Sequence, residues 1–458
     1  MSVVAVPSLA EQPLPLRLLR SKWTWILLAA TALFALCLYD QYQMVMGDAD
    51  AVDNVAPGLN FSAVKISAGL AFWTLLFWVV VFLLIDRFHP ARPNLWYLSL
   101  GWGISVATFV SIYINTWASV KLGVEQTGGD PAAAARTATF IAPFVEEAAK
   151  ATVLFWLAIL LRYRMVSKLT MISLAGLSAA GFAFTENIIY YCRVIVYSSG
   201  TIAVGDPESA LTQIVWARGV FTAFGHPLFT CMTGLGIAIA VRTRSKLVRV
   251  LAPVTGYLFA SLLHMLFNSQ TSINSEDTLY MLYFLVVLPV LLSLVIALIR
   301  QEFTQGKLIN ARLTDYVRMG WLADSDPVAF AKIRYRFRAL LIALLRGWRV
   351  FVATVRMQRT MTELAYIRDA EARGVMDEEA KARAKELILR IQGLRALAIT
   401  DPRGLKLGLP PVWKKLKALV TRRRQPEYSQ LPAGWGAPSA SATDVGYSAV
   451  NPTWDPPA

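Results

Sequence analysis

The sequence predicts an all-α membrane protein: a polytopic bundle of about eight transmembrane helices followed by a cytoplasmic helical region. Three observations support this prediction. The 458 residues are 56% hydrophobic and 16% charged, and the mean hydropathy of +0.48 lies outside the range of soluble domains. Apolar runs long enough to cross a hydrocarbon core of about 30 Å recur along the chain before residue 300. Basic residues cluster at every second loop between these runs, as in multi-pass proteins.

Residues 23–300 form the expected membrane core. Hydropathy places its eight spans at approximately 23–39, 66–86, 94–117, 138–161, 168–192, 213–241, 248–267 and 279–299. No small-residue cleavage site follows the first span, which is therefore expected to be a retained anchor. Basic residues precede span one and follow spans two, four and six, so the N-terminal segment 1–22 and the C-terminus are both expected in the cytoplasm.

Residues 301–424 are expected to form the basic cytoplasmic helical region. Arg334 to Met357 is apolar, but Arg346 and Arg349 lie near its middle. Such a segment is more typical of an amphipathic helix at the membrane surface than of a ninth span. A cytoplasmic protein partner at 305–424 is an open alternative, because nothing in the sequence selects it.

Two soluble helices are predicted next, over 360–374 and 378–398. Gly374 is expected to end the first helix, and Asp377 is expected to cap the second. Residues 425–458 are rich in Pro, Gly, Ser and Ala. Because that composition cannot bury a core, this tail is predicted to be disordered.

Two global features exclude other classes of protein. The formal net charge is +15, but most of the excess follows residue 300, as cytoplasmic tails of membrane proteins allow, and no nucleic-acid-binding motif is present. The three cysteines, Cys37, Cys192 and Cys231, show no paired spacing. Neither a nucleic-acid partner nor a disulfide framework is therefore expected, and the cysteines are predicted to be buried spectators.

The fourth span contains the strongest functional signal, because Glu146, Glu147 and Lys150 interrupt an otherwise apolar run. Each charge near the middle of a bilayer costs about 2.5 to 3.5 kcal/mol on insertion scales. Either glutamate can pair with the lysine at helical spacing. A salt bridge alone therefore leaves one carboxylate unexplained.

Each of the next three spans carries polar residues of its own. They are Glu186 and Asn187 in span five, His226 in span six, and His264 and Asn268 in span seven. Counted at 1.5 Å per residue from the span ends, these residues and Glu146 lie between the middle and the outer boundary of the membrane. One shared polar cavity that opens toward the outside would hold them all.

Acids, histidines and amides in such a cavity suit hydrolysis of a peptide bond. A glutamate can take a proton from water, while histidine and asparagine can bind the developing oxyanion. Alternatively Glu186, His226 and His264 could hold a metal ion, Zn²⁺ being the candidate, with a position open for water. The His-Glu-x-x-His spacing of many zinc proteases is absent, so the sequence leaves the metal open.

These motifs resemble those of the PrsW intramembrane proteases, which are related to the type II CAAX prenyl endopeptidases and the Abi proteins. The resemblance covers about 138–268. The matching residues are Glu146-Glu147-x-x-Lys150, Phe182-x-x-x-Glu186 continuing into Asn187, His226, and His264-x-x-x-Asn268. It implies a multi-pass protein of the bacterial plasma membrane that cuts single-span membrane proteins, such as anti-sigma factors, on the extracytoplasmic side.

The resemblance also implies roles for the residues. Glu146 would be the general base, Glu147 and Lys150 would hold the charge and geometry of the site, and the two histidines with Asn268 would bind water and oxyanion. Prenyl endopeptidases have histidine where this chain has Glu186, which argues against prenylated substrates. Family members are classified as glutamic or as metallopeptidases, and the sequence does not decide between the two.

Two other functions fit parts of the sequence. A proton-coupled transporter needs the same intramembrane acids and histidines, but the chain shows no inverted repeat. A noncatalytic scaffold that recruits partners through the basic cytoplasmic region would not need Glu146. Peptide hydrolysis accounts for the largest number of these residues.

Overall fold

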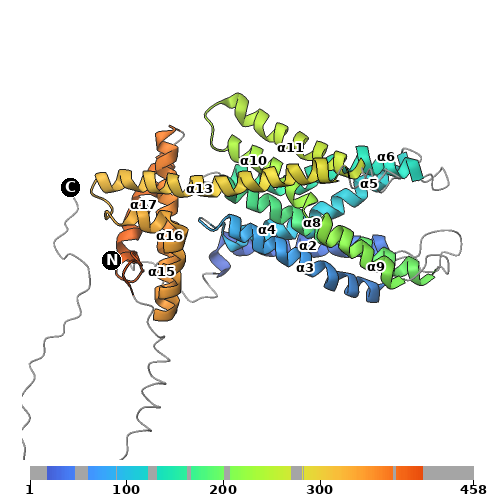
Figure 1. The fold of residues 1–458 in the computed structure, drawn as a ribbon, viewed down its shortest axis with the longest axis horizontal. Helices are drawn as coiled ribbons and strands as arrows, with labels where there is room; N and C mark the ends of the chain where they lie inside the picture. The colour runs from blue at the N-terminus through green and yellow to red at the C-terminus, as the bar shows by residue number, and fades with distance from the viewer. Residues whose placement is uncertain are drawn as a thin grey trace, which may run out of the picture. The chain divides into compact units, whose positions relative to one another are not determined.

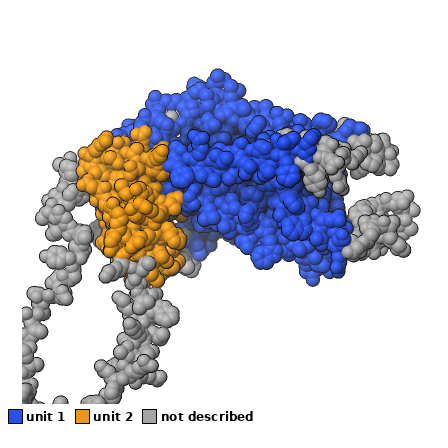
Figure 2. Space-filling view, viewed as in Figure 1, with its two compact units in different colours: residues 1–305, 366–381 blue, residues 306–365, 382–458 orange. Residues whose placement is uncertain are grey.

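The computed structural model describes residues 18–46, 60–88, 90–121, 131–161, 167–200, 207–269, 281, 283–374 and 378–405, and over these residues it is helical without strands (Figure 1). The chain divides into two compact units (Figure 2). Unit 1 comprises Met1–Gln305 and Tyr366–Lys381, and unit 2 comprises Gly306–Ala365 and Ala382–Ala458. The all-α prediction is confirmed.

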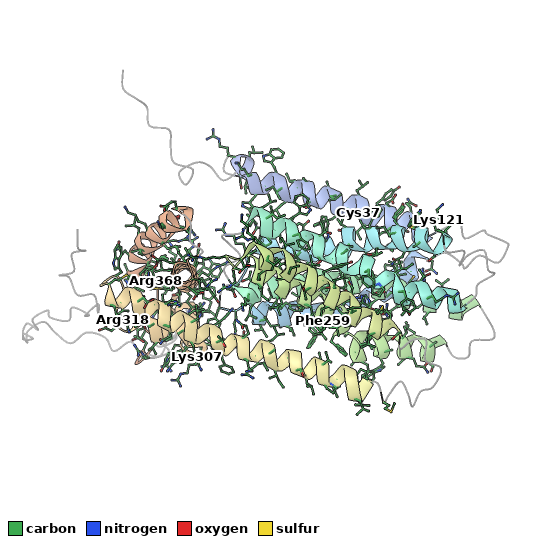
Figure 3. All side chains as sticks on the ribbon, turned by 90° about the horizontal axis from the view of Figure 1, so that it is seen from above. Cys37, Lys121, Phe259, Lys307, Arg318 and Arg368 are labelled. Carbon is green, nitrogen blue, oxygen red and sulfur yellow. The ribbon has the colours of Figure 1, made fainter. Side chains whose placement is uncertain are left out.

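Seven of the described helices are long and apolar enough to cross a membrane. Large apolar side chains cover their outer faces, Phe259 among them (Figure 3). The predicted class, a polytopic membrane bundle, is thereby confirmed. The seven are α2 (Lys22–Met46), α3 (Phe61–Ile85), α4 (Pro93–Trp102) with η1 (Gly103–Ala107) and α5 (Thr108–Lys121), α8 (Lys168–Gly200), α9 (Pro207–Trp216) with η3 (Ala217–Phe221) and α10 (Gly225–Ala240), α11 (Lys246–Ser269), and η5 (Tyr283–Val287) with α13 (Leu288–Arg318).

The remaining predicted span, the fourth (138–161), is not a continuous helix. It is divided at Ile141 into α6 (Pro131–Phe140) and α7 (Ala142–Leu160). Pro143 is the second residue of α7, a position where proline loses no helical hydrogen bond because first-turn amides have no intrahelical partner. The proline therefore lies in the first turn of a new helix. Helix α7 is not one of the seven apolar helices because it carries three charged residues.

Span six is also discontinuous. Its π-helical segment η3 ends at Phe221, and α10 begins only at Gly225. Pro227 is the third residue of α10, so it again lies in a first turn, where its missing N–H costs nothing. Both prolines near the predicted site thus mark helix starts within the membrane core.

Helix α8 lies at the centre of unit 1, packed against α3, α4 and α10. Small residues between Ala175 and Ala183 allow this close packing. A Cβ atom on Gly103 of η1 would lie 1.8 Å from the carbonyl oxygen of Ser178, and one on Gly181 would lie 2.4 Å from that of Leu100. The backbones of α8 and the α4–η1 segment are therefore in direct contact, as small residues permit in membrane bundles.

In unit 2, the prediction of one continuous amphipathic helix over Arg334–Met357 is wrong. Gly347 has φ of 121°, a conformation that a helix cannot contain, and it separates α15 (Ile333–Arg346) from α16 (Trp348–Ala372). Helix α14 (Asp326–Ala331) precedes them. One side of α15 packs into a small core with Ile399. This core gives unit 2 a folded interior of its own.

The two helices predicted after residue 360 are present with different bounds. The first is the later part of α16, and Gly374 follows its end with φ of 61°, as expected for a helix-terminating glycine. The second is α17 (Glu378–Arg395). The predicted cap Asp377 and the predicted disordered tail 425–458 lie outside the described residues.

The close contact of η1 with α8 predicts a sharp difference between two glycine substitutions. Gly103→Ala would force two backbones apart and should destabilise the protein by about 1–3 kcal/mol, the usual cost of overpacking. Gly69→Ala in α3 is the control, because a Cβ there meets nothing within 4 Å. Thermal unfolding in detergent, monitored by size-exclusion chromatography, would show a lowered unfolding midpoint for Gly103→Ala alone. Equal midpoints would contradict the packing.

Candidate active site

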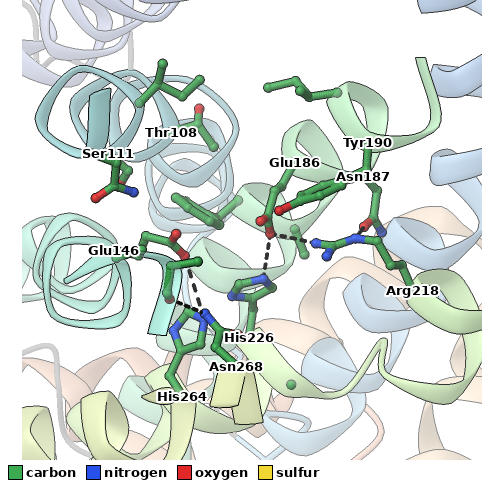
Figure 4. Close-up of a pocket in the computed structure, with 18 of the residues that line it drawn as sticks. Thr108, Ser111, Glu146, Glu186, Asn187, Tyr190, Arg218, His226, His264 and Asn268 are labelled. Carbon is green, nitrogen blue, oxygen red and sulfur yellow. Dashed lines mark hydrogen bonds and ion pairs between the residues drawn. The ribbon is translucent and has the colours of Figure 1, made fainter. Parts of the chain in front are cut away.

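A cavity of about 420 Å³ in unit 1 brings the predicted residues together (Figure 4). It is lined by residues of α5, α7, α8, η3, α10 and α11. Six of the eight predicted site residues line this cavity, namely Glu146, Glu186, Asn187, His226, His264 and Asn268. The other two, Glu147 and Lys150, are fully buried behind it. The structure thus contains the single shared polar cavity that the span depths predicted.

The Lys150 ammonium is the central cation of this cluster. Its Nζ lies 2.7 Å from Oε1 of Glu147 and 2.9 Å from Nδ1 of His226. Glu146 is farther away, with Oε2 at 3.6 Å. The ammonium also lies over the ring of Phe182, with Nζ 4.2 Å from the ring centroid. These contacts supply the partners that a charge buried among membrane helices requires.

The two adjacent glutamates differ in their surroundings. Glu147 accepts hydrogen bonds from Lys150 and from Thr230, whose Oγ1 lies 2.7 Å from Oε2. Oε2 of Glu146 is buried and accepts no hydrogen bond within the described part of the chain. It lines the cavity and lies 3.9 Å from Nε2 of His264. Glu147 is therefore tied into the protein, whereas one oxygen of Glu146 is open to a ligand or water.

Hydrogen-bond chemistry assigns opposite tautomers to the two histidines. Lysine only donates, so Nδ1 of His226 accepts from Lys150, which places the hydrogen of the neutral ring on Nε2, 2.6 Å from Oε2 of Glu186. His264 is the opposite tautomer. Its Nδ1 carries the hydrogen and donates it to Oε1 of Glu147 at 3.1 Å. The lone pair of its Nε2 is consequently left on the side of Glu146.

Glu186 also contacts Arg218, a residue that sequence reasoning missed. Nη2 of Arg218 lies 2.9 Å from Oε2 of Glu186, and its Nε donates to Oδ1 of Asn187 at 3.0 Å. The guanidinium also lies over the ring of Tyr190. An arginine within a predicted span is itself an unusual feature, and that signal could have marked Arg218 as the partner of Glu186.

Asn268 joins two helices at the edge of the cavity. Its Nδ2 donates to the carbonyl oxygen of Ala138 at 2.9 Å. This contact connects the end of α11 to α6, next to the break at Ile141.

A metal ion could be held here by a Glu/His/His group that shares both histidines with the set expected from the sequence. Ligand atoms of Glu146, His226 and His264 all lie within 4.8 Å of one another, and His226 would bind an ion by exchanging its contact with Lys150 or Glu186. Glu186 itself contacts His226 and Arg218. Two histidines and one glutamate are a known catalytic zinc set. The open oxygen of Glu146 and the open Nε2 of His264 fit such an ion, and Glu147 orients His264 as an outer-shell carboxylate would.

Fold and cavity together define the class of protein, a polytopic membrane bundle with an ionisable site among its helices. A family model described as "PrsW family intramembrane metalloprotease" matches residues 91–294. Residues 91–294 are therefore a PrsW-family domain, and the protein is an intramembrane peptidase. Comparison with curated proteins and with solved structures gives no match. The family match confirms the prediction of an enzyme over that of a transporter or scaffold.

The contrast between the adjacent glutamates predicts different effects on stability. Glu147→Gln would remove the carboxylate that pairs with buried Lys150, and breaking a buried pair costs about 3–5 kcal/mol. Glu146→Gln should cost far less, because Oε2 of Glu146 makes no hydrogen bond. Thermal unfolding of both variants in the same detergent would test this. A Glu146→Gln midpoint as low as that of Glu147→Gln would contradict the separate roles.

Proposed function

We propose that the protein hydrolyses a peptide bond of single-span membrane proteins, anti-sigma factors among them, with Glu146 as the group that takes the proton of water. One observation carries the proposal: Oε2 of Glu146, a residue that lines the cavity, accepts no hydrogen bond within the described part of the chain and lies 3.9 Å from Nε2 of His264. A water between these two atoms can donate to both. Glu146 can then remove one proton as the oxygen attacks the substrate carbonyl.

The other residues would position the reacting groups. Glu147 holds Lys150 and His264, and Arg218 holds Glu186 against His226. Asn268, which lines the cavity, would bind the oxyanion that forms on the attacked carbonyl. Glu146 would return its proton to the leaving amine, which completes the hydrolysis with the carboxylate restored.

A divalent ion, zinc by its donor set, would be held by Glu146, His226 and His264. When bound, such an ion polarises a carbonyl and lowers the pKa of a bound water. Glu146 lies at the open side of the cluster in both schemes. Loss of its carboxylate would therefore stop the reaction whether or not a metal takes part.

The proposed orientation places the cut in the outer half of a bacterial plasma membrane. Basic loops precede α2 and follow α3, α7 and α10 in the sequence, which supports cytoplasmic termini. In that orientation α7 and α10 begin toward the outer side. Residues 301–424 would be cytoplasmic, and a partner there would be a cytoplasmic protein.

Removal of the proposed base should abolish cleavage without loss of the protein. Glu146→Gln and His264→Ala are expected to reduce proteolysis of a single-span substrate in liposomes by about 10²–10⁴-fold, the usual contribution of a positioned base. Glu208→Gln is the matched control, because this exposed carboxylate lies outside the cavity, and Cys192→Ala is a second. Full cleavage by Glu146→Gln would refute the assignment of the base.

The metal scheme makes a separate prediction about the metal content of the purified protein. If Glu146, His226 and His264 hold zinc, elemental analysis of the purified protein should find about one ion per chain, and His226→Ala with His264→Ala should lose it. A chelator should then stop cleavage, and added Zn²⁺ should restore it. Cleavage that persists in chelator, by protein without stoichiometric metal, would instead support a glutamate acting alone.

A further inference from the structure

Helix α15 of unit 2 has two apolar sides. Arg336, Ala339, Ile342 and Ala343 form its buried side. Phe337, Leu341 and Leu344 recur at i, i+4 and i+7 on the opposite side, with exposures of 68%, 38% and 53%. The unit's own core therefore does not account for this second stripe.

The stripe continues beyond the end of the helix. Trp348, just after the Gly347 break, is 70% exposed. Arg334, Arg338, Arg346 and Arg349 are exposed around these apolar residues. An apolar stripe of this kind on the surface of a folded unit marks an interaction site. We name Phe337, Leu341, Leu344 and Trp348 the α15 stripe.

The charge of the surrounding segment selects the partner. Between Lys332 and Thr362 the sequence has eight basic residues and no acidic residue. A second copy of the same surface would be repelled. An anionic lipid surface attracts such a segment, and its interfacial region accommodates Phe, Leu and Trp beside arginine head groups.

Unit 2 is joined covalently to the membrane core. Ile333 follows Arg300, where the predicted membrane core ends, by thirty-three positions. Tethering raises the effective concentration of the second contact, so modest lipid affinity suffices. We propose that the α15 stripe is a peripheral membrane anchor that lies in the head-group region of an anionic bilayer. The inference does not depend on the proposed chemistry of the cavity.

The buried state of the native cysteines allows a direct test. Cys37, Cys192 and Cys231 are all buried, so Leu341→Cys would provide the reactive thiol for an environment-sensitive fluorophore such as NBD. Lys385→Cys on α17 is the matched control, because it is exposed on the same unit and lies outside the stripe. Both full-length proteins would be placed in nanodiscs of phosphatidylcholine, with or without phosphatidylglycerol.

The label at position 341 should shift to blue in anionic nanodiscs and be quenched by nitroxide lipids, whereas the label at position 385 should do neither. Arg346→Glu with Arg349→Glu should reverse the shift. Equal emission in both nanodiscs, or no quenching by nitroxide lipids, would overturn the proposal. A shift in detergent that rises with protein concentration would also overturn it, by assigning the stripe to contact between copies. The same label at Leu344→Cys provides an independent second position.

Discussion

The buried ammonium of Lys150 is the charge on which the interior of the membrane core depends. A cation among apolar helices is tolerated only when it is fully partnered, and Glu147, His226 and the ring of Phe182 provide those partners. These residues come from α7, α10 and α8. One electrostatic centre thus ties three helices together, and Thr230 and His264 complete it through Glu147.

The helix breaks give the cavity its second electrostatic property. Helices α7 and α10 both begin beside the cavity. A helix N-terminus carries a partial positive charge and free N–H groups, which favour nearby carboxylates and developing anions. Irregular backbone is tolerated at membrane depth where it lines a polar cavity. The breaks at Ile141 and after Phe221 therefore combine with buried acids to make a site that uniform spans could not form.

The sequence was sufficient to predict the bundle and the residues of the cavity. The length of each apolar run identifies a membrane span, and ionisable residues within such runs identify the side chains that line an internal cavity. The sequence could not predict the breaks, since Pro143 and Pro227 are equally compatible with a kink and a helix start. It also could not decide which acid lies beside both histidines, because Glu146 and Glu186 have similar depths. Glu186 pairs with Arg218 and contacts His226, whereas Glu146 lies near both histidines, and only the folded arrangement reveals these pairings.

The position of the cavity along the helices has a consequence for the products. Glu146 is the fifth residue of α7, His226 is the second of α10, and His264 lies near the end of α11. The cavity therefore lies between the middle of the bundle and one end, the end at which α11 stops. A substrate helix cut at that level yields fragments of unequal apolar length. The longer fragment keeps most of the roughly 20 residues that a span needs, so it stays embedded, whereas the shorter one can leave the membrane.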